Sequence, residues 1–138
     1  MQDLLSTKVN SPSIFKRKIL LIGSCINQDH PQIIKKVRKE RVILSTCLEK
    51  DHMNVVESKL VTIIRVSKIN DLCVLTVDGS PHCWQLHMIS ESLKYLFGDS
   101  LKVTNYVVEK GELIKISHKV IKTARHLSAV KKLVESCN

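Results

Sequence analysis

Residues 72–87 read LCVLTVDGSPHCWQLH, and this stretch decides the fold. Its first six residues form a mainly apolar run, which predicts a strand that is buried on both faces. Ser80 followed by Pro81 is typical of a helix start, with Ser80 as the N-cap and Pro81 in the first turn. Apolar side chains keep helical spacing from Leu86 to Phe97. A buried strand, a tight turn and a helix therefore follow one another, as in the repeating unit of α/β proteins.

Further strands and helices are expected on both sides of this unit. Apolar runs of strand length alternate with helical spacing before it, and a β-hairpin and a last helix follow it. The expected strands are residues 18–23, 42–46, 72–77, 102–109 and 112–117, and the expected helices begin at Pro31, after Asp51 as a cap, at Pro81, and at Ser117 or His118. The order βαβαβαββα predicts a three-layer α/β fold of the flavodoxin or Rossmann-like type, with a mostly parallel sheet and an antiparallel C-terminal hairpin. We expect the five strands in the spatial order 2-1-3-4-5.

The chain length predicts a single folded domain. Residues 1–17 are expected to form an N-terminal arm that is partly ordered at best, and residues 18–138 to form one α/β domain. The apolar runs have strand length, so we expect no membrane-spanning segment, and residues 1–18 lack the apolar core of a secretory signal. Five cysteines, an odd number, in a chain with an ample core argue against a disulfide scaffold. The sequence therefore predicts a cytoplasmic protein in a reducing compartment.

The chain is strongly basic, with 22 Lys and Arg against 13 Asp and Glu and a formal net charge of +9. Such a charge favours polyanionic partners. The densest basic cluster lies on the helix expected after Pro31, and its members are Lys35, Lys36, Arg38, Lys39 and Arg41. This cluster is either an ordinary solvated helix face or the surface of a binding module. In the second case the partner would be nucleic acid, or a protein (a second copy of this chain included) that engages the basic helix or the hairpin edge.

Three cysteines follow the first three expected strands. Cys25, Cys47 and Cys83 each come shortly after the end of one of these strands. The carboxyl ends of parallel strands meet at one edge of a sheet, so we expect the three thiols at that edge. In the expected strand order, the first and third strands flank the switch point, the crevice where open α/β sheets bind ligands. Cys25 and Cys83 should therefore line this crevice, and Cys47 should lie one strand away.

A metal centre is the first chemistry that these cysteines indicate. Cys83 and His87 are four residues apart, so a helix places them on nearly the same face and both can reach one ion. Cys25 and Cys47 would complete a thiolate-rich set of four ligands, which selects zinc or an iron–sulfur cluster. The chain contains no Cys-x-x-Cys pair, which is the usual sign of such centres.

Thiol chemistry without a metal is the second alternative. Cys83 lies in the first turn of its expected helix, where unpaired backbone N–H groups and the helix dipole favour a thiolate. Cys83 would then be the nucleophile and Cys25 the resolving thiol. His82 or His87 would be the proton partner. Asp78, in the turn before the helix, is first a turn former and second a candidate general base.

An anion-binding site is the third alternative. Gly23 and Ser24 follow the first expected strand, and Gly79 and Ser80 precede the helix of Cys83. Their backbone N–H groups could bind a phosphate or a carboxylate, for example of a nucleotide. Neither pair belongs to a P-loop or to a G-x-G-x-x-G fingerprint, so the sequence favours a thiol or metal site over dinucleotide binding.

Three segments of the chain resemble a small family of uncharacterised, largely archaeal α/β proteins. They are residues 22–25, residues 46–52 and residues 77–87, the last with the signature Val-Asp-Gly-Ser-Pro-His-Cys. The resemblance covers about residues 18–135 and implies the fold, without a particular activity. The layout is also distantly similar to the flavodoxin-like half of the small subunits of hydrogenases and related quinone oxidoreductases. In those subunits, cysteines on strand-end loops hold an iron–sulfur cluster, which implies that Cys25, Cys47 and Cys83 converge.

Overall fold

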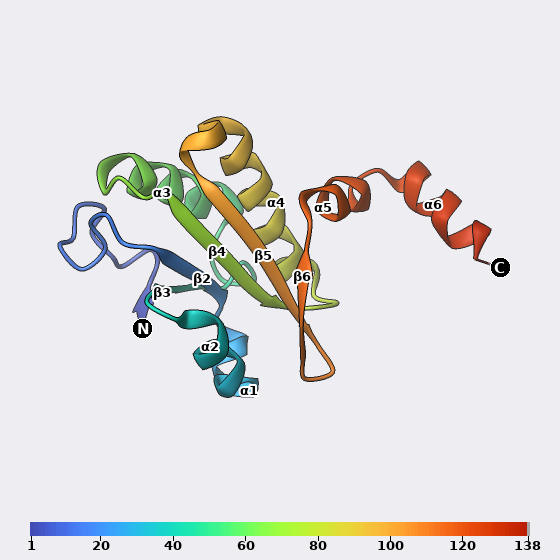
Figure 1. Cartoon of the computed structure of the whole chain (residues 1–138), viewed down its shortest axis with the longest axis horizontal. Coiled ribbons are helices and arrows are strands. Elements are labelled where there is room, and N and C mark those ends of the chain that lie inside the picture. The colour runs from blue at the N-terminus through green and yellow to red at the C-terminus, as the bar shows by residue number, and fades with distance from the viewer. Residues whose placement is uncertain (138) are drawn as a thin grey trace.

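The computed structural model describes residues 1–137 of the chain. Within these residues, six strands form one sheet in the order β1-β3-β2-β4-β5-β6 (Figure 1). The strands are β1 (Gln2–Asp3), β2 (Ile19–Gly23), β3 (Val42–Thr46), β4 (Asp71–Val77), β5 (Lys102–Glu109) and β6 (Glu112–Ile116). Neighbouring strands are parallel except β5 and β6, which form an antiparallel hairpin. The predicted fold class and the predicted order of five strands are confirmed, and β1 is an additional strand beside β3.

Helices cover both faces of the sheet. They are α1 (Cys25–Asp29), α2 (Pro31–Arg38), α3 (Met53–Val66) and α4 (Pro81–Phe97). Successive side chains of a strand point to opposite faces, so Leu21 of β2 packs in the hydrophobic layer of α3 and α4, while Leu20 packs in that of α1 and α2. Every residue of β2 is buried, as expected for a central parallel strand. The sheet therefore lies between two helical layers, as predicted (Figure 1).

The N-terminal segment is packed against the sheet, which corrects the expectation of a loose arm at residues 1–17. β1 pairs with β3, and the side chains of Leu4 and Ile14 are fully buried in the layer of α3 and α4. Isolated apolar residues in a polar stretch have no periodicity, so a pattern could not predict their burial. Asn138, the last residue of the predicted domain, lies outside the described residues.

The first helices after β2 and β3 start differently from the prediction. α1 is a short helix where the sequence predicts a loop. α3 begins at Met53 with His52 as its N-cap, so the predicted Asp51 cap is wrong. The Asp51 carboxylate instead accepts a hydrogen bond from Thr46 Oγ1 (3.1 Å), which ties the end of the loop between β3 and α3 to the end of β3.

The last predicted helix is divided into two, α5 (His118–Ala124) and α6 (Leu127–Ser136). Ser117 Oγ accepts a hydrogen bond from the Val120 N–H (3.3 Å) and caps α5 at the predicted position. The structure shows no buried residue on α6, and this helix extends away from the sheet (Figure 1). A short 3-10 turn, η1 (Gly98–Ser100), follows α4. Across residues 1–137, helices long and apolar enough to cross a membrane are absent.

Candidate functional site

The switch point of the sheet lies at the carboxyl ends of β2 and β4. β2 continues into α1 and β4 continues into α4, and these helices belong to opposite layers of the fold. β2 and β3 end level with each other, because Gly23 pairs with Thr46. Cys25, Cys47 and Cys83 all follow these strand ends, so the topology brings three sulfur atoms to one edge of the sheet.

α4 begins where the sequence predicts, because two local features act together. Ser80 Oγ accepts a hydrogen bond from the Cys83 N–H (3.3 Å), and Pro81 occupies the first turn. Gly79, with a φ of 87°, makes a turn that residues with a side chain rarely adopt. These features hold Cys83 on the first turn of α4, beside the switch point of the sheet.

Cys83 and Cys25 are neighbours at the switch point. Cys83 is buried, and its Sγ would lie 3.3 Å from a Cβ atom added to Gly23, so the glycine leaves space for the sulfur. Cys25, two residues after Gly23, is exposed. Partial burial raises the pKa of the Cys25 thiol, and Cys83 raises this pKa further through its charge and as a side-chain hydrogen-bond partner. An exposed cysteine and a buried cysteine are therefore close to each other at this end of the sheet.

The accessibility of the two thiols differs from the predicted roles. The sequence predicts Cys83 as the reactive nucleophile, but this residue is only 7% exposed. A reagent in solution meets Cys25 first. Cys47 is half-buried, and its charge adds the smallest of the increases to the pKa of Cys25, so it lies near the pair without joining it. Cys73 is a core residue of β4, where burial raises the pKa of its thiol to about 11.

His87 is engaged inside the fold, which corrects its predicted role as a metal ligand or proton partner. His87 is only 4% exposed, and its Nδ1 lies 2.8 Å from Asn105 Oδ1. Nε2 lies 2.7 Å from Thr76 Oγ1, so both ring nitrogens have partners on the sheet. Burial lowers the pKa of His87, which favours the neutral ring.

Several polar groups of the turns after β2 and β4 already form hydrogen bonds within the protein. The Asp78 carboxylate accepts a hydrogen bond from the Gly79 N–H (3.1 Å), which agrees with its first predicted role as a turn former. The Ser24 N–H donates to the Thr46 carbonyl (2.9 Å), and the Ser80 hydroxyl accepts from α4. Of the predicted anion site at Gly23, Ser24, Gly79 and Ser80, two N–H groups are therefore already occupied.

The four predicted metal ligands do not form a centre. Within residues 1–137, no group of three or more His, Cys, Asp or Glu side chains is placed to hold a metal ion. The hydrogen bonds of His87 hold its ring between α4 and the sheet, away from a shared ligand position. The expectation of zinc or an iron–sulfur cluster at Cys25, Cys47 and Cys83 is therefore not supported. Cys25 and Cys83 are left as the candidate site.

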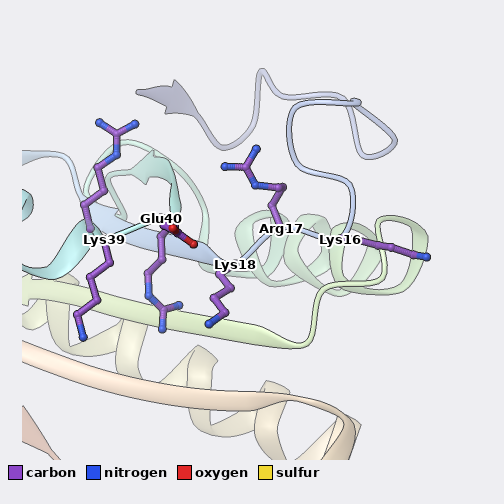
Figure 2. A pocket seen from close by; sticks show the side chains of 7 residues that line it. Lys16, Arg17, Lys18, Lys39 and Glu40 are labelled. Atoms are coloured by element: carbon purple, nitrogen blue, oxygen red, sulfur yellow. The ribbon is translucent and has the colours of Figure 1, made fainter.

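A second polar feature lies at the amino edge of the sheet, opposite the thiols. An open cleft of about 530 Å³ separates the segment before β2 from the segment before β3 (Figure 2). It is lined by Lys16, Arg17, Lys18, Arg38, Lys39, Glu40 and Arg41. The sequence predicts only the second of these basic segments as a basic cluster. The missed signal is that a basic run directly precedes each of two strands that are neighbours in the sheet.

The fold defines the class of the protein. It is an α/β protein with a mostly parallel sheet, helices on both faces and a switch point between two central strands. The sequence profile of the Rossmann-like domain family matches residues 11–137, and the chain belongs to this family. No curated protein and no solved structure matches the chain. The family match includes every described helix and strand except β1.

Proposed function

We propose that the chain is a thiol-redox protein in which Cys25 and Cys83 alternate between two thiols and one disulfide. The observation that supports this proposal is the placement of the two residues, because the sulfur of the buried Cys83 lies against Gly23, two residues before the exposed Cys25. Two cysteines placed on neighbouring strand-end segments can form a disulfide bond after a local movement of the side chains and backbone. Gly23 contributes by leaving room for the Cys83 sulfur at the end of β2.

The proposed reaction is thiol–disulfide exchange with a small-molecule disulfide as the oxidant. The Cys25 thiolate attacks one sulfur of this disulfide, forms a mixed disulfide and releases the other sulfur as a thiolate. Cys83 then loses its proton and attacks the Cys25 sulfur, so the Cys25–Cys83 bond forms and the second small thiol leaves. Two electrons pass from the two cysteines to the small disulfide, and the two protons go to the released thiolates.

The raised pKa of Cys25 sets the pH dependence of this reaction. At neutral pH only a small fraction of Cys25 is thiolate, so the first attack is slow. The rate of oxidation should rise with pH through and above the ordinary range of a cysteine thiol.

Oxidation with glutathione disulfide, followed by alkylation of the remaining thiols and peptide mass spectrometry, tests the proposal. In the wild-type chain, Cys25 and Cys83 should both lose their free thiols and yield a peptide pair joined through these two residues. The Cys83→Ser variant should stop at a mixed disulfide between Cys25 and glutathione. Cys137→Ser, which removes an exposed cysteine far along the chain, is the matched control and should behave like wild type. A disulfide between Cys25 and Cys47, or mixed disulfides without any internal bond, would refute the proposal.

A further inference from the structure

We propose that the amino edge of the sheet binds single-stranded nucleic acid through its phosphates. This site is separate from the thiol pair, because it lies at the opposite ends of the same strands. Six of the seven residues that line the cleft are Lys or Arg, and Glu40 is the one acidic residue among them. In Figure 2, Lys18 and Lys39 extend in the same direction from neighbouring segments, so both charges can meet one ligand.

A second hollow continues this basic surface onto the open face of the sheet beside α2. It has a volume of about 320 Å³, and Lys39 and Arg41 line both hollows. The second hollow adds Lys36, Lys102 and Lys115, so nine Lys and Arg side chains and one acid line the two hollows in the described part of the chain. This local excess of positive charge is close to the net charge of the whole chain, +9. The charge of the protein is therefore concentrated at one edge rather than spread over its surface.

The width of the basic surface favours a ligand with several phosphates. Its cations come from the ends of β3, β2, β5 and β6, and β4 lies between β2 and β5. Neighbouring strands are about 4.8 Å apart, so the surface is roughly 19 Å wide. One phosphate would meet only part of it. A phosphodiester chain presents charges at regular intervals and can contact the whole width.

The surface combines one fixed cation with several free ones. Arg41 Nη1 donates to Asp71 Oδ1 (2.8 Å) and to the Ile19 carbonyl (3.2 Å), which holds this side chain at the boundary between the two hollows. Lysines around it keep long flexible side chains, which suit contacts to phosphates without sequence preference. Tyr106 lines the second hollow and offers an aromatic ring on which an unpaired base can stack. An accessible base requires a single strand.

Lys39, which belongs to this surface, has an unfavourable backbone conformation. It ends α2 with φ 49° and ψ −121°, close to the φ 59° and ψ −137° of Gly98 at the end of α4. Glycine adopts this conformation without steric clash, whereas a side chain does not. Lys39 thus places a charged side chain at a position that suits glycine, and this side chain lines both hollows.

Fluorescence anisotropy of a labelled single-stranded RNA oligonucleotide with the full chain tests this inference. The variant R17Q/K18Q/R38Q should bind at least about tenfold more weakly than wild type, because three phosphate contacts are lost. The slope of log affinity against log salt concentration should decrease by about two, since each contact to a single strand contributes about 0.7. K39G should also weaken binding without lowering the melting temperature, because glycine suits the backbone there.

The matched control is K119Q/K122Q/K132Q, which removes three exposed lysines from α5 and α6 and so leaves the same net charge. It should change the affinity by less than about twofold. Equal losses in the two triple variants would show attraction by net charge alone and overturn the inference. Binding of polyglutamate as tight as that of RNA, or no RNA binding at low salt, would overturn it as well.

Discussion

His87 lies between α4 and the sheet as the centre of a closed hydrogen-bond network. Asn105 Oδ1 is an acceptor, so Nδ1 of His87 carries the proton, and Nε2 accepts from the Thr76 hydroxyl. The Ser90 hydroxyl also donates to Asn105 Oδ1 (2.8 Å). The neutral imidazole therefore satisfies its partners, and a proton added to the ring would bring a charge into the interior.

This network predicts that the protein loses stability as the pH falls below 6.5, the ordinary pKa of histidine. Burial lowers the pKa of His87 in the folded state, and the charge of Asp78 opposes this only in part, so the unfolded chain binds a proton more readily. Between 6.5 and the lower folded pKa, each decrease in pH therefore reduces the free energy of unfolding. Urea unfolding at about pH 7 and about pH 5 should show a larger loss for wild type than for His87→Gln, which lacks this titration. An equal loss in both proteins would contradict the assignment.

For single residues, the sequence predicts the position of a side chain on its helix better than the role of that side chain. The spacing of Cys83 and His87 places both on the buried side of α4, as the structure shows. The partners of His87, however, are Thr76 and Asn105, which come from β4 and β5. Such contacts depend on how distant segments pack, so local spacing cannot distinguish a ligand from a buried structural histidine.

Two helices of the chain are capped in the same way but bury different amounts of surface. The hydroxyls of Ser80 and Ser117 each accept a hydrogen bond from the N–H three residues later, at 3.3 Å. α4 buries six residues against the sheet, whereas α5 buries only Ile121 among its described residues. The same cap therefore supports a central element in one case and a peripheral element in the other.

Ser80→Ala should lower the free energy of unfolding by about 1 kcal/mol, because the first turn of α4 loses its side-chain acceptor. Ser117→Ala is the matched control, and its effect should be smaller, since fraying of α5 exposes little apolar surface. Urea unfolding followed by circular dichroism measures both values. A larger effect of Ser117→Ala would mean that α5 contributes more to the core than its burial indicates.

The elements that the sequence predicts best carry clear signals at both ends. β3, β5 and α4 begin and end at the predicted residues, and α4 has Ser80-Pro81 before it and Gly98 after it. The division of the last helix at Arg125 and His126 has no such signal, because neither Gly nor Pro stands there. α1 is also too short, with five residues, to show a helical period.

At the scale of the whole molecule, α6 is the element least connected to the rest. Leu127 and Leu133 are 77% and 58% exposed, and the helix lies beyond α5 at the far side from β1 (Figure 1). Hydrophobic burial is the main source of stability in a folded domain, so a helix without buried residues adds little to it.

A chain that ends at His126 should therefore keep the fold, with a change in the free energy of unfolding of less than about 0.5 kcal/mol. A chain that ends at Ile116 is the comparison and should be less stable, because it also loses the buried side chain of Ile121. Urea unfolding of both chains checks these expectations. Loss of a cooperative transition in the longer chain would show that α6 contributes to folding.

The two edges of the sheet lie at opposite ends of β2, whose five residues span about 17 Å of extended chain. Exposed charges this far apart are largely screened from each other at physiological ionic strength. This separation explains how the thiol of Cys25 keeps a raised pKa in a chain of net charge +9, since none of the groups that shift its pKa is a lysine or arginine. A polyanion that neutralises the basic edge would consequently leave the pKa of the cysteine thiols unchanged. Binding of the polyanion and oxidation of the thiols would then be independent of each other.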